Sequence, residues 1–192
     1  MRTEAANRPE TPLLDERRLV QKAKSGDPEA FARLYDAYVE RVYRYIYFRV
    51  SDDAATEDLT SQVFLKAWES VSRYRPGSSP FLAWLYSIAR NLVIDHYRTK
   101  KETVDLEDII HITSNGPSPD EEVQKRFELQ EMRKALQFLT DEQREVVTLR
   151  FIAGLSTEEV AAVMEKREGA IRALQMRALH ALYQYMMEKE MI

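Results

Sequence analysis

Residues 139–164 of the chain read LTDEQREVVTLRFIAGLSTEEVAAVM, and residues 165–179 continue EKREGAIRALQMRAL. The first stretch holds two capping boxes, Thr140–Gln143 and Ser156–Glu159, in which a hydroxyl side chain is followed three residues later by Gln or Glu. Each box predicts the start of a helix, and Gly154 separates the two helices. A short turn then leads into a longer final helix. This order predicts a helix-turn-helix, although an unrelated three-helix packing module would show much of the same pattern.

The final helix has two contrasting faces when its residues are placed on a helical wheel. Its inward face is apolar and consists of Ile171, Leu174, Ala178 and Leu182. The centre of its outward face is formed by Gly169, Ala173, Met176 and His180, and the cations around it are Lys166, Arg167, Arg172 and Arg177. Small residues let a helix approach the major groove, while cations reach phosphates or guanine edges. The outward face is therefore a candidate for duplex binding, with His180 expected to be a surface side chain.

Upstream, three helices are predicted before a break rich in Pro, Gly and Ser at residues 73–80. Apolar residues recur every three or four positions through residues 27–50 and again through residues 51–71, which is typical of amphipathic helices. In the helix at residues 27–50, Asp27 is the predicted N-cap, and the proline that follows it lies in the first turn. A shorter helix over residues 13–25 precedes them. The sequence thus predicts an all-α fold.

A long helix is predicted from residue 81 to residue 101. Its core-facing stripe is Phe81, Trp84, Leu85, Ile88 and Leu92, and the opposite face, predicted to be exposed, centres on Tyr86, Arg90, Val93 and Tyr97. The helix carries four basic residues against one acid, Asp95. Aromatic rings stack on unpaired bases while cations follow the phosphates, so this face is a candidate for single-stranded DNA. The alternative is an ordinary solvated face with cations near a helix C-terminus.

Acidic charge is concentrated in residues 102–122, which contain seven acids and no Lys or Arg. Removing those seven negative charges from the net charge of −4 leaves +3 on the remaining residues. The segment also contains Gly116, Pro117 and Pro119, a composition typical of linkers. The sequence therefore predicts two small helical domains, at 12–101 and 123–192, joined by an acidic flexible linker. The linker is either a solvated loop or an acidic tether that repels DNA or docks on a basic surface.

Several classes of function are excluded or disfavoured. The chain has no cysteine, and its histidines, His96, His111 and His180, are too dispersed for a local zinc motif. Its five glycines are too widely spaced for a dinucleotide fingerprint or a phosphate loop. The longest stretch without a charged residue, 76–89, is shorter than the about 20 residues that cross a bilayer, and the N-terminus lacks the apolar core of a secretory signal. We expect a cytoplasmic protein with no metal and no cofactor.

Taken together, these stretches resemble the extracytoplasmic-function (ECF, group IV) sigma factors of bacterial RNA polymerase. In the first half, DPEAFARLYDAYVERVYRYIYFRV at 27–50, DLTSQVFLKAW at 58–68 and FLAWLYSIARNLVIDHYR at 81–98 follow the order and spacing of the family's region 2. In the second half, residues 139–164 and GAIRALQMRAL at 169–179 resemble region 4. Helix-turn-helix units are common, but both halves in this order around a short linker are highly specific.

The resemblance implies a role for each half. Region 2 would bind the clamp helices of the polymerase beta-prime subunit through Asp58, Gln62, Leu65 and Glu69. It would also capture the melted minus-ten strand, with an extruded base, through Arg75, Ser78, Ser79, Tyr86, Arg90, Asn91, Tyr97, Arg98, Lys100 and Lys101. Region 4 would contact the beta flap and the minus-thirty-five duplex, the latter through Thr157, Lys166, Arg167, Gly169, Arg172, Ala173, Met176 and Arg177. The resemblance also implies promoter-specific transcription initiation, no catalytic residue, no membrane insertion and an anti-sigma factor as a partner.

The chain departs from the family at two places in region 4. Glu165 stands in the turn where glycine is frequent, and Ala173, Leu174 and Met176 occupy positions that are commonly small and polar or basic. The departures favour phosphate positioning over base readout by this helix. The small positive charge outside the linker also predicts weak binding to free DNA, because electrostatic affinity grows with the number of phosphates neutralised.

Two other classes of protein remain as alternatives. A stand-alone helix-turn-helix regulator would bind duplex operators without polymerase, usually as a dimer, and the aromatic and basic helix at 81–101 argues against it. An enzyme with paired carboxylates could use Asp52, Asp53, Glu57 and Asp58. These acids are better explained as helix N-terminal charges and partner contacts, and no histidine stands near them in sequence.

Overall fold

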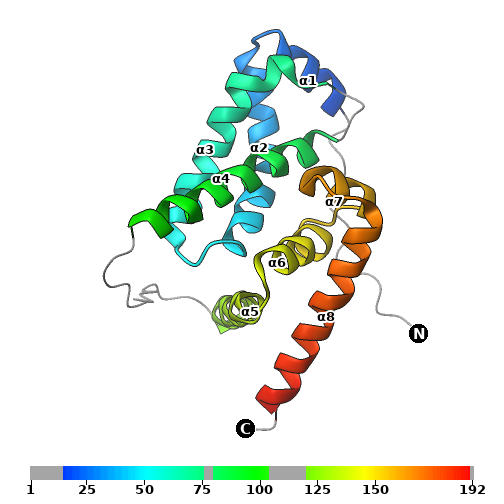
Figure 1. The fold of residues 1–192 in the computed structure, drawn as a ribbon. Helices are drawn as coiled ribbons and strands as arrows, with labels where there is room; N and C mark the ends of the chain where they lie inside the picture. The colour runs from blue at the N-terminus through cyan, green and yellow to red at the C-terminus, as the bar shows by residue number, and fades with distance from the viewer. Residues whose placement is uncertain (1–14, 76–79, 104–119, 191–192) are drawn as a thin grey trace, which may run out of the picture.

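The computed structural model describes residues 15–75, 80–103 and 120–190, and all regular secondary structure in these ranges is helical (Figure 1). The first unit contains α1 (Glu16–Lys24), α2 (Pro28–Tyr47), α3 (Asp53–Ser70), the short η1 (Val71–Arg73) and α4 (Phe81–Thr103). The second contains α5 (Asp120–Gln137), α6 (Asp141–Val147), its π-helical extension η2 (Thr148–Ile152), α7 (Thr157–Met164) and α8 (Glu168–Glu190). The predicted all-α fold of two helical units is confirmed. Among the described helices, none combines the length and apolar character needed to cross a bilayer.

The helix starts follow the capping signals in the sequence. The Asp27 carboxylate accepts hydrogen bonds from the backbone N–H groups of Glu29 and Ala30, at 3.0 and 3.1 Å, and Pro28 occupies the first turn of α2. Both predicted capping boxes form: Thr140 and Gln143 bond reciprocally at the start of α6, and so do Ser156 and Glu159 at the start of α7. Each box satisfies backbone donors that would otherwise lack partners, so the helix-turn-helix begins where the sequence predicts.

The core of the first unit lies between α2, α3 and α4, with α1 packed on α2. At one end, Phe81 is only 1% exposed and opens α4 inside a group of aromatic rings. Its ring centroid lies 6.0 Å from that of Tyr38, 5.4 Å from Tyr74 and 5.3 Å from Trp84. The Lys24 ammonium donates to the Tyr74 carbonyl at 2.6 Å. These contacts fix the segment that leads toward the break before α4.

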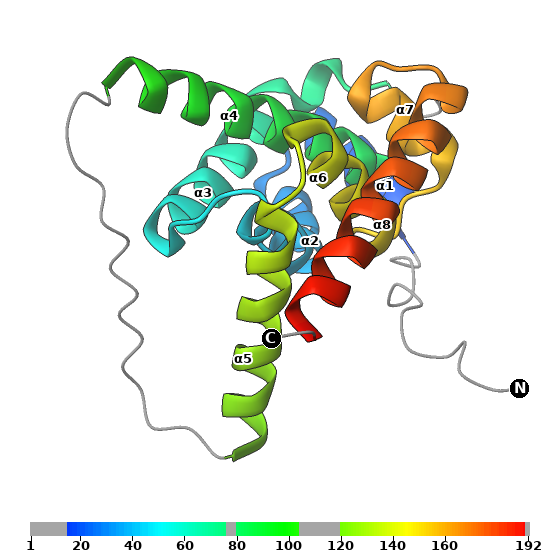
Figure 2. The ribbon, with the colours of Figure 1, turned by 60° about the horizontal axis from the view of Figure 1, so that its bottom comes forward.

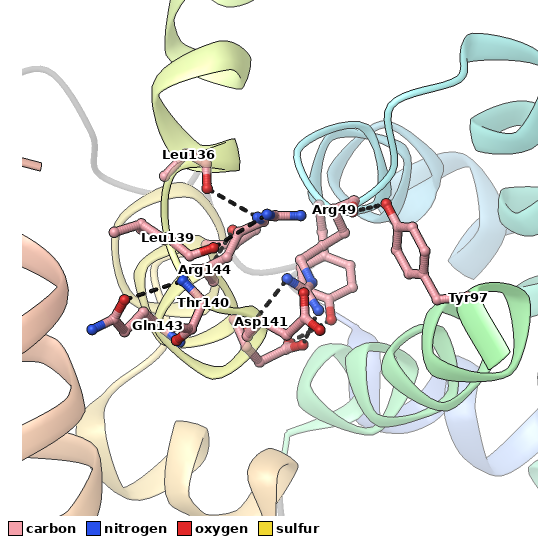
Figure 3. Close-up of polar contacts among 11 residues, drawn as sticks. Arg49, Tyr97, Leu136, Leu139, Thr140, Asp141, Gln143 and Arg144 are labelled. Carbon is pink, nitrogen blue, oxygen red and sulfur yellow. Dashed lines mark hydrogen bonds and ion pairs between the residues drawn. The ribbon is translucent and has the colours of Figure 1, made fainter. Parts of the chain in front are cut away.

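The same hydrophobic core continues into the second unit, where α6, η2, α7 and α8 meet. Leu149, Val160, Ile171 and Ala178 are fully buried there. The predicted inward face of α8 is confirmed, since Leu174 is also buried and Leu182 packs against the core. Arg144 of α6 donates to the carbonyls of Leu136, Gln137 and Leu139, which ties the C-terminal end of α5 to the unit (Figure 3).

The turn of the helix-turn-helix contains one residue in a left-handed conformation. Glu165 has φ 54° and ψ 41°, and it is the non-glycine residue with positive φ within the described ranges. This conformation costs an L-residue about 1–2 kcal/mol, whereas glycine adopts it freely. The backbone of the turn therefore explains why glycine suits this position and why Glu165 is a strained substitute.

Replacing Glu165 with glycine is expected to raise the free energy of unfolding by about 0.5–1 kcal/mol, because the relief of strain exceeds the added freedom of the unfolded chain. Urea denaturation followed by helix content measures the change. Ala162→Gly is the matched control: Ala162 is exposed in the middle of α7, and glycine in a regular helix should lower stability by about 1 kcal/mol. A loss of stability in both variants would contradict the left-handed turn.

Candidate nucleic-acid interface

Helix α4 lies between the α2–α3 pair and the second unit (Figure 1). On one side it packs on α2 and α3, and it also contacts α7 of the helix-turn-helix. The prediction of an exposed face along α4 was therefore wrong for Tyr86 and Val93, which are both fully buried. Tyr86 packs against Tyr45 of α2 with 5.1 Å between ring centroids. Burial raises the pKa of Tyr86 to about 12, against the opposing effect of Arg41 and Arg44.

The other minus-ten candidates are distributed unevenly over α4 and the segment before it. Arg90 and Tyr97 are half-buried. The Tyr97 hydroxyl donates to the Arg49 carbonyl at 2.9 Å (Figure 3). The exposed candidates are Arg75, Asn91, Arg98 and Lys100, of which Arg98 forms an ion pair with Asp95 at 3.1 Å. Ser78 and Ser79 lie outside the described residues, as does the side chain of Lys101.

A buried ion pair joins the two units. Arg49, just after α2, and Glu145 of α6 are each 4% exposed, with 3.0 Å between Arg49 Nη2 and Glu145 Oε2. The Tyr45 hydroxyl, also from α2, donates to Glu145 Oε1 at 2.5 Å. Arg49 Nη1 reaches the Asp141 carbonyl at 3.4 Å (Figure 3). The Glu145 carboxylate therefore accepts from two buried donors of the first unit.

The electrostatics of this contact keep both donors protonated. Burial raises the pKa of Tyr45 well above its usual value, and the Glu145 carboxylate raises it further. Burial acts to lower the pKa of the Arg49 guanidinium, but Glu145 and the other groups around it leave that pKa raised. Near neutral pH, Tyr45 thus remains a hydroxyl donor and Arg49 a cation, and the charge of Glu145 is matched across the interface.

A second connection comes from the C-terminal part of α5, while the rest of this helix projects away from the first unit (Figure 2). The Arg133 guanidinium donates to the Val50 carbonyl at 3.0 and 2.7 Å through Nε and Nη2, and pairs with Asp53 at 2.6 Å through Nη1. It also lies over the Tyr47 ring, 4.0 Å from the centroid. Sequence reasoning missed Arg133, Arg49 and Glu145. For Glu145 the sequence held one signal: this charged residue stands directly before two apolar residues, Val146 and Val147, which are buried in α6 together with it.

The polymerase-binding candidates share one face of α3. Asp58, Gln62, Leu65 and Glu69 follow one another at spacings of four, three and four, which places them in a row along the helix. The Gln62 amide donates to Asp58 at 2.6 Å, and Leu65 is 59% exposed. Leu65 thus adds an exposed apolar side chain to a row of polar ones. The structure therefore brings all four together.

The duplex-binding candidates gather at the start of α8 and in the turn before it. Arg167, Gly169, Arg172, Ala173, Met176 and Arg177 are exposed, Met176 by 74%, while Thr157 and Lys166 are half-buried. Two of the cations are paired within the unit: Lys166 with Glu142 at 2.7 Å, and Arg172 with Glu168 at 2.5 Å. The outward face predicted for α8 is thus open to solvent. Within the described residues, no cluster of three His, Asp or Glu side chains could hold a metal ion.

Comparison with known proteins places both halves in one family. Residues 34–103 match the family model for Sigma-70 region 2, and residues 135–184 match that for Sigma-70, region 4. The ECF RNA polymerase sigma factor BldN of Streptomyces coelicolor is 42% identical over 166 residues, which span 85% of this chain and 63% of BldN. The ECF RNA polymerase sigma factor SigX of Bacillus subtilis is 32% identical over 165 residues, 82% of this chain and 84% of SigX. These relatives are sigma factors, which are not enzymes.

Solved structures show the same architecture. CnrH, in a complex with the cytosolic domain of CnrY, superposes with a TM-score of 0.71 at 25% identity and covers 89% of this chain and 96% of its own. The sigma factor RpoE of Bartonella quintana, in a complex with the anti-sigma factor NepR, superposes with a TM-score of 0.65 at 26% identity, over 80% of this chain and 94% of its own. Both superpositions take in the two helical units at once. This chain belongs to the ECF sigma factors of RNA polymerase.

Proposed function

We propose that this chain binds core RNA polymerase and directs promoter-specific initiation of transcription, as a group IV sigma factor. Region 2, at 12–101, melts the minus-ten element, an acidic linker spans 102–122, and region 4, at 123–192, reads the minus-thirty-five element. The observation that carries the proposal is the pair of family matches in this order, at residues 34–103 and 135–184. The chain uses binding energy rather than catalysis, requires no cofactor and acts in the cytoplasm, where the polymerase works.

On region 2, the α3 face of Asp58, Gln62, Leu65 and Glu69 binds the beta-prime clamp helices. The exposed Leu65 supports this role, because an apolar side chain flanked by acids suits a helical partner with basic residues. The minus-ten strand binds along α4 and the segment before it, through the candidates named from the sequence other than Tyr86, which is buried in the core. The extrusion of one base costs a few kcal/mol, which stacking and polar contacts must offset.

On region 4, α8 enters the major groove with Gly169, Ala173 and Met176 at its centre. Arg172 and Arg177 reach phosphates or guanine edges on either side, and Lys166, Arg167 and Thr157 contact phosphates near the turn. The same region contacts the beta flap of the polymerase. An anti-sigma factor is a further partner. This part of the proposal is supported by RpoE, which is in a complex with the anti-sigma factor NepR, and by CnrH, which is in a complex with the cytosolic domain of CnrY.

A paired binding assay tests this assignment on the full chain. Fluorescently labelled protein is titrated with core polymerase, and the reconstituted holoenzyme with a promoter selected from genomic DNA. Asp58→Ala is expected to weaken core binding about tenfold and leave helix content intact, since one interfacial charge is lost. Arg172→Ala is expected to leave core binding unchanged and to weaken the binding free energy for the promoter duplex by about 1–3 kcal/mol.

The matched control is Asp36→Ala, which removes an exposed acid from α2 instead of α3 and should change neither titration. Reversed effects of the two test variants would show that the sites are misplaced. Tight duplex binding without affinity for core polymerase would assign the chain to the stand-alone regulators instead.

A further inference from the structure

The arrangement of the two units conflicts with simultaneous binding of both promoter elements. The minus-ten and minus-thirty-five elements are separated by about 25 base pairs, or roughly 85 Å at 3.4 Å per base pair. In this chain the two units touch, with 3.0 Å between the charged groups of Arg49 and Glu145. Region 4 must therefore move away from region 2 before both elements can be bound. The contact described here belongs to a closed form of the protein.

The closed form covers the strand-binding helix. α7 packs directly on α4, and η2 contacts α2. Of the predicted strand-binding residues on α4, Arg90 and Tyr97 are half-buried in this form, whereas Asn91, Arg98 and Lys100 are exposed. By contrast, Leu65 on the α3 face and Met176 on α8 stay largely exposed. The closed form therefore covers part of one of the three proposed binding surfaces and leaves the other two open.

Charge is complementary at the Arg49–Glu145 contact, where the cation belongs to region 2 and the carboxylate to region 4, whereas the Arg133–Asp53 pair has the opposite polarity. Around the Tyr45–Tyr86 ring pair, Arg41, Arg44, Arg49 and Arg90 all act on one or both tyrosines. The carboxylates that act on Arg49 are Glu145 and Asp141, which both belong to α6. The Nε atoms of Arg49 and Arg90 are buried without a hydrogen-bond partner. Region 2 thus presents an anion site that region 4 fills with its own carboxylate.

We propose that Glu145 makes an autoinhibitory contact: in the free chain it occupies an anion site formed by Arg49 and Tyr45 on the strand-binding side of region 2. When region 4 moves away, this site receives a phosphate of the single-stranded promoter DNA. A carboxylate and a phosphate oxygen accept from the same guanidinium and hydroxyl donors, so each can replace the other. Arg49 lies next to the proposed strand-binding residue Tyr97, whose hydroxyl donates to the Arg49 carbonyl. This inference rests on the proposed function for the identity of the anion.

The Arg49–Glu145 ion pair is well suited to an interface that opens when region 4 moves away from region 2. A buried ion pair gains little net stability over an apolar contact, because both charges lose water on burial. Once the units separate, Arg49, Tyr45 and Glu145 are rehydrated or find new partners, whereas an exposed apolar surface would favour reclosure. Core polymerase binds the α3 face and region 4 in separated positions. It therefore binds the open form more tightly than the closed form, and it shifts the chain toward the open form.

Two readouts on the full chain test the proposal. Because the protein has no cysteine, Ala32→Cys on α2 and Ala162→Cys on α7, both exposed positions, carry a donor and an acceptor dye. Energy transfer between the dyes reports closure, and titration with oligodeoxythymidine reports access to the phosphate site without a promoter sequence. Glu145→Gln is expected to lower transfer and to raise affinity for the oligonucleotide about tenfold or more, since affinity scales with the open fraction.

The matched control is Glu142→Gln, which removes the same charge from α6 but pairs only within region 4, with Lys166. It should leave transfer high and oligonucleotide affinity unchanged. Adding Arg49→Gln to Glu145→Gln should make the salt dependence of binding shallower by about 0.7, the value for one phosphate contact on a single strand. Helix content is recorded for every variant, so that opening is distinguished from unfolding.

Each result has a stated consequence. High transfer in Glu145→Gln overturns the autoinhibitory contact, and so does low transfer without a gain in oligonucleotide affinity. An unchanged salt dependence in the double variant overturns the phosphate site at Arg49. Core polymerase is then added to the labelled wild-type chain. Failure to bind would remove the proposed function, while the closure measured without polymerase would stand on its own.

Discussion

Replacing Phe81 with alanine is expected to lower the free energy of unfolding of region 2 by about 3–5 kcal/mol. Phe81 is 1% exposed, and three aromatic rings, those of Tyr38, Tyr74 and Trp84, surround it at the start of α4. The loss combines the transfer free energy of the ring with the cavity left among rigid neighbours, which cannot collapse onto an alanine. Since native proteins are stable by only about 5–15 kcal/mol, this loss should move the unfolding of region 2 to markedly lower urea concentrations.

Urea denaturation followed by tryptophan fluorescence and by helix content measures this change. Leu65→Ala serves as the control, since Leu65 is 59% exposed on α3 and its truncation should change stability by less than about 0.5 kcal/mol. The two variants separate structure from function: Phe81→Ala destabilises region 2, whereas Leu65→Ala keeps it folded and weakens core-polymerase binding. A small effect of Phe81→Ala would mean that the aromatic group repacks around the cavity.

Local signals in the sequence were sufficient to predict the helices and the residues at which they begin. Capping depends on residues three apart, so Asp27, Thr140 and Ser156 could be identified without any knowledge of the fold. The same holds for α8, where periodicity alone separated buried Ile171 from exposed Met176. These features are set by the chain within one or two turns of the helix.

The second face of α4 could not be predicted in this way. Periodicity shows that Tyr86 and Leu92 lie on different faces, but it does not show how many neighbours the helix has. α4 contacts helices of both units, so both faces are largely buried, and Tyr86, with its polar hydroxyl, was assigned to solvent although it is fully buried. The contact of Tyr45 with Glu145 joins residues 100 positions apart, and no local pattern indicates such a pair.

Replacing Glu145 alone with leucine is expected to destabilise the closed form by about 3–5 kcal/mol relative to the open form, because Arg49 stays buried without its carboxylate. Changing both partners, as Arg49→Met with Glu145→Leu, is expected to restore most of that loss, since neither charge then has to be buried. The opening free energy is measured from energy transfer between the dyes at residues 32 and 162 as urea is added. Additive effects of the two substitutions would contradict a direct interaction between the side chains.

The double variant also separates the stability of the closed form from its ability to open. An apolar pair of similar volume closes as well as the ion pair or better, but it gains no hydration when the units part. We therefore expect the double variant to remain closed, to bind core polymerase more weakly than the wild-type chain and to initiate less transcription, even though it is no less stable. Transcription equal to that of the wild type would show that opening is not limited by this contact. If instead the expected loss is observed, the function of Arg49 and Glu145 is to make closure reversible rather than to make it strong.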